Sequence, residues 1–353
     1  MPHSVVAVLG TSPDTVIGDY RRLLDLASSR ETLARGRGIA VHATLAWQPF
    51  FPSCSTPPWQ LDGVLGALIG GGFDPGEIVA WYDNAARIPL SQGRVLNRHN
   101  PVLDRHGVRA FDSDSGGRRV PYRPKAPMRV LHRMFPGGIP VPERLIGRAL
   151  VHLPTLKTRR DAIVSGAAVS ALECWLGREA RRAADSVNEA LVDILAVERE
   201  LCPGVLAVMD GVFAGEGPGP LDLMPHEKNV ILASNDPLSL DSVALTLMGF
   251  DPMETGYVRM AHEAGVGTGA PGDIELVGDD FSGTRFGFRI AETAGARRVR
   301  VIERAASGTP LEPLAGLVST VYYNWYRFLA FGEDRIRRAM NGAWGKVFEG
   351  YRR

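Results

Sequence analysis

Residues 205–220, V-L-A-V-M-D-G-V-F-A-G-E-G-P-G-P, join an apolar run to an acid and then to a glycine-rich segment. The apolar run predicts a buried β-strand, and Asp210 then marks its carboxyl end. Ligands of open α/β sheets bind in the crevice outside the carboxyl ends of the strands. We therefore predict a ligand site here, with Gly215, Gly217 and Gly219 letting the backbone approach a bound substrate closely.

Strands and helices alternate on both sides of this stretch. Further strands are expected at residues 5–9, 38–45, 78–82, 149–153, 229–233 and 273–277, and helices at 60–69, 162–176, 187–197 and 238–248. This alternation favours an α/β fold whose parallel or mixed sheets are covered on both faces.

A segment rich in proline and arginine, residues 113–148, interrupts the alternation. We interpret it as a linker, or an excursion that could act as a lid, between two α/β lobes at residues 1–112 and 149–302, with the ligand cleft between the lobes. Residues 303–353 combine aromatic side chains with arginines at helical spacing. We expect this helical tail to pack on its own domain or on a second copy of the chain, with membrane-surface binding as the alternative.

The composition is that of an ordinary globular protein, with 353 residues, 45% hydrophobic and 22% charged. The net charge of +1 argues against nucleic-acid binding. Arginine supplies nearly all the basic residues, which is typical of a GC-rich bacterial genome. The first residues lack the features of a signal peptide, and no apolar run reaches membrane-spanning length, so we expect a cytoplasmic protein without a transmembrane segment.

Three cysteines, Cys54, Cys174 and Cys202, stand far apart in the sequence. Their spacing forms neither an iron–sulfur motif nor a zinc motif. We expect reduced, buried thiols and no iron–sulfur cluster.

Three blocks in order resemble the domain of unknown function 362 family. They are L-V-H-L-P-T-L-K-T at 150–158, the segment 210–220, and N-V-I-L-A-S-N-D-P-L-S-L-D-S-V-A-L-T-L-M-G-F-D-P at 229–252. The resemblance extends over roughly residues 150–278. Some members of that family carry cysteine-rich iron–sulfur domains, so this chain resembles a branch without them. A redox role would then need an external cofactor.

The chain departs from the family pattern at several polar positions. The family's K-x-H is Lys157, Thr158 and Arg159 here, and a lysine–asparagine pair is matched by Glu173 and Cys174. The lysine that the family has at the end of the second strand is His42 here. The departures imply a specialised branch with its own substrate.

Lys157 follows an apolar strand, and burial readily lowers the pKa of a lysine. It is therefore our candidate for a base or a Schiff-base nucleophile, with simple anion binding as the alternative. Arg159 and Arg160 follow it, and guanidinium groups suit a carboxylate or phosphate. The three residues predict an anionic substrate.

Asp210, Asp236 and Asp241 lie near predicted strand ends. Clustered carboxylates hold divalent metals, and Asp210 is in addition a candidate for proton transfer. Capping of the helix at 238–248 is the alternative for Asp236.

Histidines supply the remaining candidates, although no metal-binding motif joins them. His226 follows the glycine-rich segment and is our third catalytic candidate, while His42 is a candidate for substrate binding and His152 for metal ligation or proton transfer. The aromatic loop at 47–59 either lines a pocket for an aromatic substrate or packs on the sheet. The chain shows no convincing nucleotide-binding motif.

These residues predict an enzyme that acts on a small anionic metabolite, aromatic in one reading, in a biosynthetic pathway. Its chemistry would be metal-assisted or cofactor-independent acid–base catalysis. The alternatives are an oxidoreductase with an external cofactor and a non-catalytic ligand-binding protein that kept the family cleft.

Overall fold

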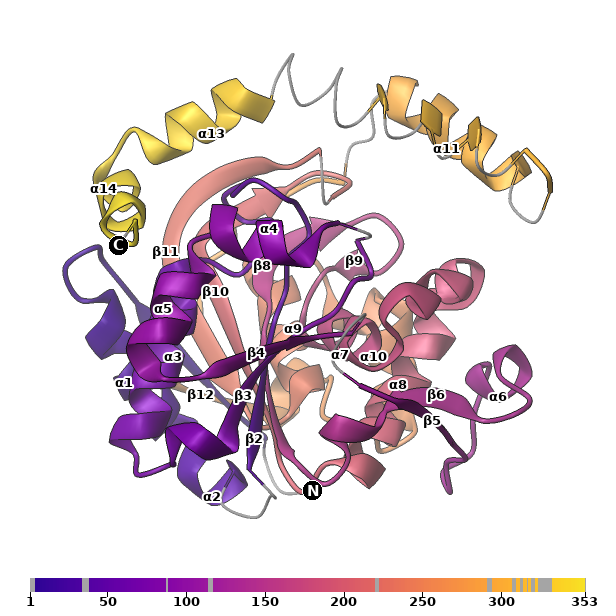
Figure 1. Ribbon diagram of the computed structural model, residues 1–353, viewed down its shortest axis with the longest axis horizontal. Helices are drawn as coiled ribbons and strands as arrows, with labels where there is room; N and C mark the ends of the chain where they lie inside the picture. Colours follow the sequence, from indigo (N-terminus) through magenta and orange to yellow (C-terminus); the bar gives the residue numbers. More distant parts are fainter. Residues whose placement is uncertain are drawn as a thin grey trace.

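The computed structural model describes residues 4–33, 38–86, 88–113, 117–219, 222–290, 294–306, 309–311, 314–315, 317–318, 321–322 and 332–352. A large mixed sheet forms its centre (Figure 1). The strand order is β12 (Ile274–Gly278), β1 (Ser4–Gly10), β11 (Met224–Ser234), β10 (Val205–Glu216), β7 (Ala149–Leu153), β2 (Ile39–Ala43), β3 (Ile78–Tyr82) and β4 (Arg109–Asp112). Beside this path, β8 (Thr155–Arg159) pairs with β10 and with the short β9 (Ile163–Val164).

The sheet is mostly parallel. Strand β11 runs antiparallel to both of its neighbours, whereas β10, β7, β2, β3 and β4 pair in parallel. The α/β fold predicted from the sequence is confirmed, and so are the positions of its main strands.

Separate sheets in two lobes are not found. Residues 39–43 of β2 pair one to one with residues 149–153 of β7, and β1 lies between β11 and β12. Strands from both sequence halves therefore intermingle in a single sheet, and the prediction of separate sheets with a cleft between them is wrong. All five residues of β2 are buried, so the strand needs partners on both edges, and the partner on one edge comes from the distant half of the chain. The domain boundaries themselves stay a prediction.

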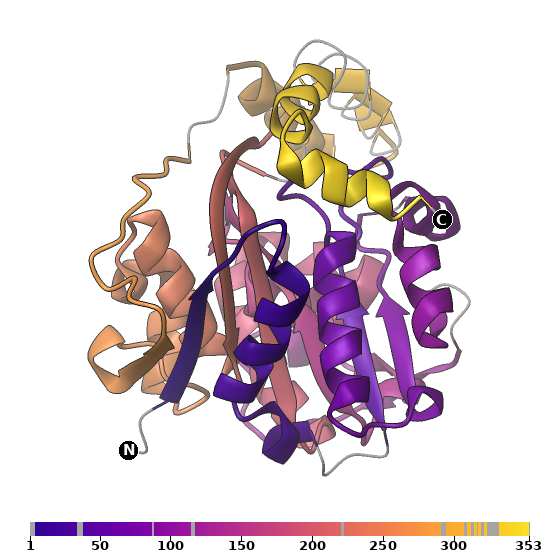
Figure 2. The same cartoon turned by 90° about the vertical axis from the view of Figure 1, so that its left-hand side faces the viewer.

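Helices cover both faces of the sheet, and Figure 2 shows α1 and α3 in front of it. On that face lie α1 (Val16–Leu26), α2 (Ser29–Leu33), α3 (Pro58–Gly70), α4 (Leu90–Leu96) and α5 (His99–His106), and on the other α7 (Ala167–Leu176), α8 (Val187–Leu201), α9 (Pro237–Met248) and α10 (Gly256–Glu263). Short 3₁₀ segments occur at Pro75–Glu77, Glu143–Leu145, Gly177–Ser186, Pro252–Glu254 and Pro271–Asp273. Alternate strand residues feed the two cores, as Ala40 and Val41 do on opposite faces of β2.

The proline-rich excursion contains β5 (Arg119–Tyr122), α6 (Leu131–Met134) and β6 (Ile139–Pro142). Strands β5 and β6 form a separate antiparallel pair. Asp193 of α8 accepts hydrogen bonds from the backbone N–H groups of residues 129–131, at 2.7–2.9 Å. The described part of the excursion is thus an ordered hairpin that is fastened to α8.

The glycine-rich segment is mostly strand rather than loop. Strand β10 continues to Glu216 and forms a long hairpin with β11. A Cβ atom on Gly211 would lie 2.9 Å from the carbonyl oxygen of Val230, and one on Gly215 would lie 2.8 Å from Ser53 Oγ. These two glycines allow close packing within the protein, whereas Gly217, at φ +137°, takes a conformation that side chains disfavour.

The C-terminal helices are α11 (Ala294–Ala306), α13 (Glu333–Met340) and α14 (Ala343–Gly350), and in Figure 1 they arch over the end of the molecule opposite the N-terminus. The rings of Phe348 and Phe50 stack at 4.3 Å, and those of Trp344 and Trp59 lie 5.1 Å apart. The end of the tail therefore packs on its own domain, one of the two predicted arrangements. The aromatic residues 323–331 lie outside the described part of the chain.

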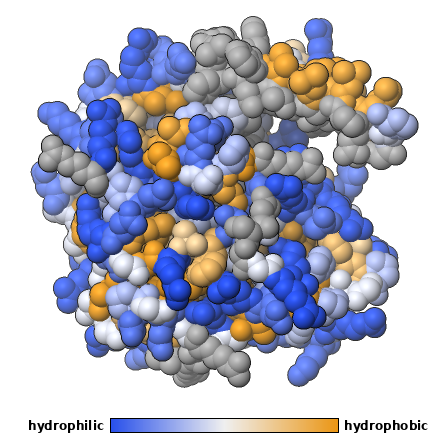
Figure 3. All heavy atoms as spheres, viewed as in Figure 1, coloured by the Kyte–Doolittle hydropathy of each residue, from blue (hydrophilic) through white to orange (hydrophobic). Residues whose placement is uncertain are grey.

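Helix α11 presents apolar side chains to solvent. Val301 is 58% exposed and Ile302 47%, and Figure 3 shows the resulting apolar patch at the upper right. Self-association through the tail stays a prediction, for which this patch offers a surface. Among the described helices, none has the length and apolar character needed to cross a membrane.

Candidate functional site

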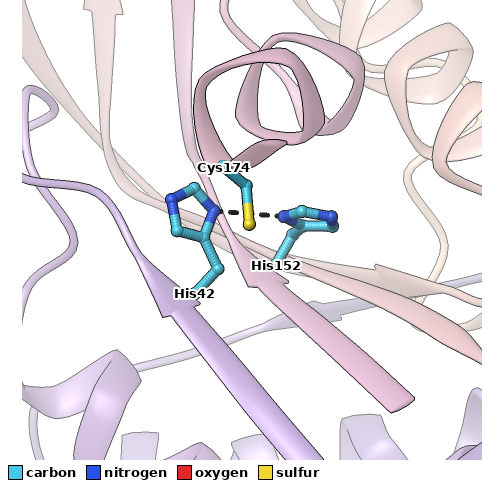
Figure 4. Close-up of side chains that lie close together, drawn as sticks. All are labelled: His42, His152 and Cys174. Carbon is cyan, nitrogen blue, oxygen red and sulfur yellow. Dashed lines mark hydrogen bonds between the residues drawn. The ribbon is translucent and has the colours of Figure 1, made fainter. Parts of the chain in front are cut away.

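Two histidines meet on adjacent parallel strands near their carboxyl ends. His42 of β2 and His152 of β7 are register partners, so their side chains project from the same face of the sheet. Both are fully buried, and their rings meet edge to face with centroids 5.3 Å apart (Figure 4). The strands I-A-V-H-A and A-L-V-H-L carry the histidine at the same position, a similarity that could have signalled the pairing.

Each histidine has its own carboxylate. His42 Nε2 lies 2.9 Å from Asp83 Oδ2, directly after β3, and His152 Nε2 lies 2.8 Å from Glu198 Oε2 on α8. Trp175 Nε1 also donates to Glu198 Oε2, at 2.8 Å. Burial lowers the pKa of His42 despite the opposing effect of Asp83.

Helix α7 closes the cluster with Ser170 and Cys174, one turn apart. Ser170 Oγ lies 3.0 Å from His42 Nδ1 and 3.2 Å from His152 Nδ1. One ring nitrogen of each histidine and the sulfur of Cys174 all lie within 4.8 Å of one another. Burial raises the pKa of the Cys174 thiol well above its usual value. In the described part of the chain, His42, His152 and Cys174 are the group of three or more side chains that could hold a metal ion.

The sequence analysis considered His42, His152 and Cys174 separately and did not predict that they lie together. All three cysteines are buried and outside disulfides, in line with the expected reduced thiols. Asp83, Ser170 and Glu198 were missed, because each is an ordinary polar residue until the fold sets it against a histidine.

A second polar group surrounds Lys157 on β8. The Lys157 side chain is 4% exposed, and its Nζ donates to Thr155 Oγ1 at 2.7 Å. Burial is the largest cause that lowers the pKa of Lys157. Ser53 Oγ is buried without a hydrogen-bond partner among the described residues, and it borders the same glycine, Gly215, as Lys157 does.

The aromatic loop lies over this second group as packing. Trp47, Phe51 and Cys54 form a buried cluster with Leu223, and Ile336 of α13 lies against it. Burial raises the pKa of the Cys54 thiol to about 12. Of the two predicted roles for the loop, the structure shows packing.

The two arginines predicted to bind the substrate differ in their surroundings: Arg159 contacts carboxylates, and Arg160 lies at the surface. Arg159 Nε lies 2.6 Å from Asp161 Oδ1, and its Nη1 lies 3.1 Å from Glu173 Oε1. Arg160 is exposed. The guanidinium of Arg159 is therefore held by carboxylates of the protein itself, and its role in substrate binding stays a prediction.

Asp210 is buried on the face opposite the histidines. Its Oδ2 accepts hydrogen bonds from Tyr20 Oη at 2.7 Å and Trp59 Nε1 at 2.8 Å, and Oδ1 accepts one from Val212 N at 3.2 Å. Burial raises the pKa of Asp210 to about 6. The carboxylate thus anchors α1 and α3 to β10, and its catalytic role stays a prediction.

Asp236 and Asp241 accept hydrogen bonds that connect the start of α9 with other segments. Asp236 caps α9 and accepts from Thr268 N at 2.8 Å. Asp241 accepts from Ala167 N at 2.6 Å and from Tyr257 Oη at 2.8 Å. The structure does not bring these aspartates together with Asp210 as metal ligands, because each carboxylate accepts hydrogen bonds from separate N–H and O–H donors. Among the described residues, the group of side chains that could hold a metal is His42, His152 and Cys174.

His226 lies on β11, and its Nε2 is 2.9 Å from Glu216 Oε2 across the hairpin. It does not fold over the glycine-rich segment as a flexible loop residue would.

A surface pocket of about 250 Å³ lies at the amino end of β10, between α8 and α9. Of the predicted site residues, Asp236 lines it, together with Glu198 of the histidine cluster.

The fold and these two groups define an α/β protein with buried polar side chains near the carboxyl ends of parallel strands. A family model described as "Domain of unknown function (DUF362)" matches residues 48–246, more than half of the chain, so the chain belongs to that family. The match includes Asp83, His152, Lys157 and Cys174, whereas His42 lies just before it.

The chain is also similar to the thylakoid-associated protein sll1697 of Synechocystis sp. (strain ATCC 27184 / PCC 6803 / Kazusa). The two are 27% identical over 117 residues, which cover 31% of this chain and 35% of the relative. The similarity thus spans about a third of the length of that curated relative.

Proposed function

We propose that this protein is an enzyme that binds a small anionic metabolite beside Lys157 and uses the lysine as an acid–base group. The observation that carries the proposal is the burial of the Lys157 amine, whose pKa burial lowers although the charge of the Glu173 carboxylate acts in the opposite direction. No ion pair to this amine occurs within the described residues, and Thr155 Oγ1 takes only one of its three possible hydrogen bonds. A buried ammonium with this environment favours an anion or gives up its proton.

The surroundings support the binding of a substrate as well as catalysis. Ser53 Oγ, which borders Gly215 beside Lys157, offers a further donor and acceptor. Both groups stand near the carboxyl end of the sheet, where α/β proteins bind ligands. Acid–base chemistry without a redox cofactor is the function that uses these groups directly. Its place in a biosynthetic pathway and in the cytoplasm is part of the same proposal.

The test compares Lys157→Met with Lys228→Met, a change at a lysine that packs on Phe286 and Phe288. Each purified protein is incubated with a deproteinised bacterial extract, and small anions are followed by mass spectrometry. We expect the natural protein and Lys228→Met to consume at least one anion, and Lys157→Met to slow that consumption at least about 100-fold, the lower range for acid–base catalysis.

Each other result has a definite meaning. Equal consumption by both variants contradicts the role of Lys157. An anion that the natural protein retains through purification and never converts would instead support the non-catalytic ligand-binding protein. Circular dichroism of Lys157→Met checks that the fold is kept.

A further inference from the structure

If both paired histidines are neutral, they have too few N–H groups to satisfy every nitrogen in the cluster. A carboxylate only accepts hydrogen bonds, so His42 Nε2 donates to Asp83 and His152 Nε2 donates to Glu198. When both imidazoles are neutral, each has a single N–H, at Nε2, which leaves a lone pair on each Nδ1. The two Nδ1 atoms are 3.2 Å apart, and in that state both lone pairs point into the same space.

Ser170 satisfies at most one of these lone pairs. Its Oγ is within reach of both Nδ1 atoms, at 3.0 and 3.2 Å, but a hydroxyl has a single hydrogen. A second buried acceptor is then left facing another acceptor, which destabilises the folded protein. A cation in this space would satisfy both nitrogens at once.

The charge of the surroundings points the same way. Asp83 is 5% exposed and Glu198 1%, and within the described ranges each has a histidine, rather than a lysine or arginine, as its ionic partner. Two carboxylates beside neutral imidazoles place about two negative charges in a buried region, which is costly without a compensating cation. A divalent ion supplies that compensation.

The distances fit a tetrahedral ion. Two ligands that lie about 2.0–2.1 Å from a tetrahedral zinc are about 3.3 Å from each other. The triangle formed by the two Nδ1 atoms and Ser170 Oγ has sides of 3.0, 3.2 and 3.2 Å. Cys174, one helical turn from Ser170, completes the set of four ligands, and its sulfur already lies within 4.8 Å of a ring nitrogen of each histidine.

We propose that His42, His152 and Cys174 bind a zinc ion, with Ser170 Oγ at the fourth position. Two imidazoles and a thiolate select zinc over magnesium or calcium, which prefer oxygen ligands. Asp83 and Glu198 hold the imidazoles through their Nε2 atoms, an arrangement that fixes the tautomer and strengthens the ligands. The site is closed to solvent, so the ion is structural and joins β2, β7 and α7. This inference is independent of the function proposed at Lys157.

The first experiment uses the full chain, expressed with added zinc and purified without chelators. We expect about one zinc per chain by elemental analysis in the natural protein and in Cys202→Ser, a matched change at a buried cysteine outside the group. Cys174→Ser should bind zinc at least about 10-fold more weakly, because even the outer partners of a zinc ligand contribute that much. Cobalt(II) in place of zinc should show a thiolate-to-cobalt absorption band that Cys174→Ser lacks and Cys202→Ser keeps.

The second experiment needs no variant, so a folding defect cannot obscure it. Chelator-treated natural protein is titrated with zinc or magnesium and its melting temperature is followed. We expect a rise that grows with the zinc concentration and no effect of magnesium at the same concentrations. The proposal is overturned if the natural protein neither retains zinc nor is stabilised by it, or if Cys174→Ser and Cys202→Ser bind zinc equally.

Discussion

Asp210 illustrates how one buried carboxylate can hold several elements at a cost. It accepts hydrogen bonds from Tyr20 on α1, from Trp59 on α3 and from the backbone of its own strand. These donors favour the charged form, yet burial outweighs them and raises its pKa to about 6. The folded protein therefore holds the Asp210 proton more tightly than the unfolded chain does.

This shift predicts a pH-dependent effect of Asp210→Asn. Below about pH 4 the aspartate is protonated in both states, and above about pH 6 the folded protein bears the full cost of burying the charge. The contribution of Asp210 to stability therefore falls as the pH rises from about 4 to 6, by about 3 kcal/mol. The amide that Asp210→Asn introduces cannot ionise, so urea unfolding at pH 4.5 and 7.5 should show the variant gaining on the natural protein at the higher pH. A difference between the two proteins that is independent of pH would refute the shift.

The residues of the candidate site were only partly predictable from the sequence. Lys157 was selected because a lysine near a strand end can be buried, and its side chain is indeed 4% exposed. The metal prediction placed the ion among aspartates, because strand ends rich in carboxylates are common metal sites. What no spacing reveals is that His42 faces His152 across 110 positions of sequence, since strand pairing decides it.

At the scale of elements, the positions of strands and helices in the sequence were predictable, but the pairing of the strands within the sheet was not. Apolar runs such as 78–82 and 149–153 mark strands by local pattern alone, and the structure has β3 and β7 at those residues. Pairing depends on which buried edges find each other over long distances, so the proline-rich excursion was taken for a division between sheets. The glycines of β10 were similarly predicted to form a loop. Gly211 and Gly215 lie in the strand instead, where close packing requires glycine.

The packing role of the strand glycines predicts that Gly211→Ala is destabilising. The added methyl group would lie 2.9 Å from both Val230 Cγ1 and the Val230 carbonyl oxygen, and the backbone atom cannot move without disturbing β11. We expect a loss of about 1–3 kcal/mol in the free energy of unfolding, as for overpacking in a core.

Gly18→Ala is the matched control. It lies on α1 with no atom within 4 Å of the new methyl group, and it should gain about 0.5–1 kcal/mol from helix propensity. Urea denaturation measures both variants. If Gly211→Ala is as stable as the natural protein, the close approach of β10 and β11 is not what requires glycine.

For the whole molecule, the decisive feature is that the end of the chain returns to the N-terminal half. Helices α13 and α14 lie beside the end of the sheet in both Figure 1 and Figure 2. Tyr351 Oη donates to Asp62 Oδ2 at 2.9 Å, and Trp344 Nε1 donates to Asn229 Oδ1 at 2.8 Å. The tail thus contributes to the same hydrophobic core as α3, although the sequence shows it only as an amphipathic segment with several possible partners.

If the tail belongs to the cooperative fold, Trp344→Ala should destabilise the entire protein. Trp344 is 1% exposed and packs on Trp59, and replacing a buried tryptophan by alanine costs about 3–5 kcal/mol. Arg338→Ala, in the neighbouring helix and with a side chain 77% exposed, should change stability by less than about 0.5 kcal/mol.

Urea unfolding is followed by far-UV circular dichroism, which reports the whole fold, and by tryptophan fluorescence. Coincident transitions shifted to lower urea in Trp344→Ala are expected, because loss of the tail packing then weakens the core that α3 shares with the sheet. A circular dichroism transition that stays at the urea concentration of the natural protein would mean that α13 and α14 unfold on their own, and that the sheet and its buried histidines do not depend on them.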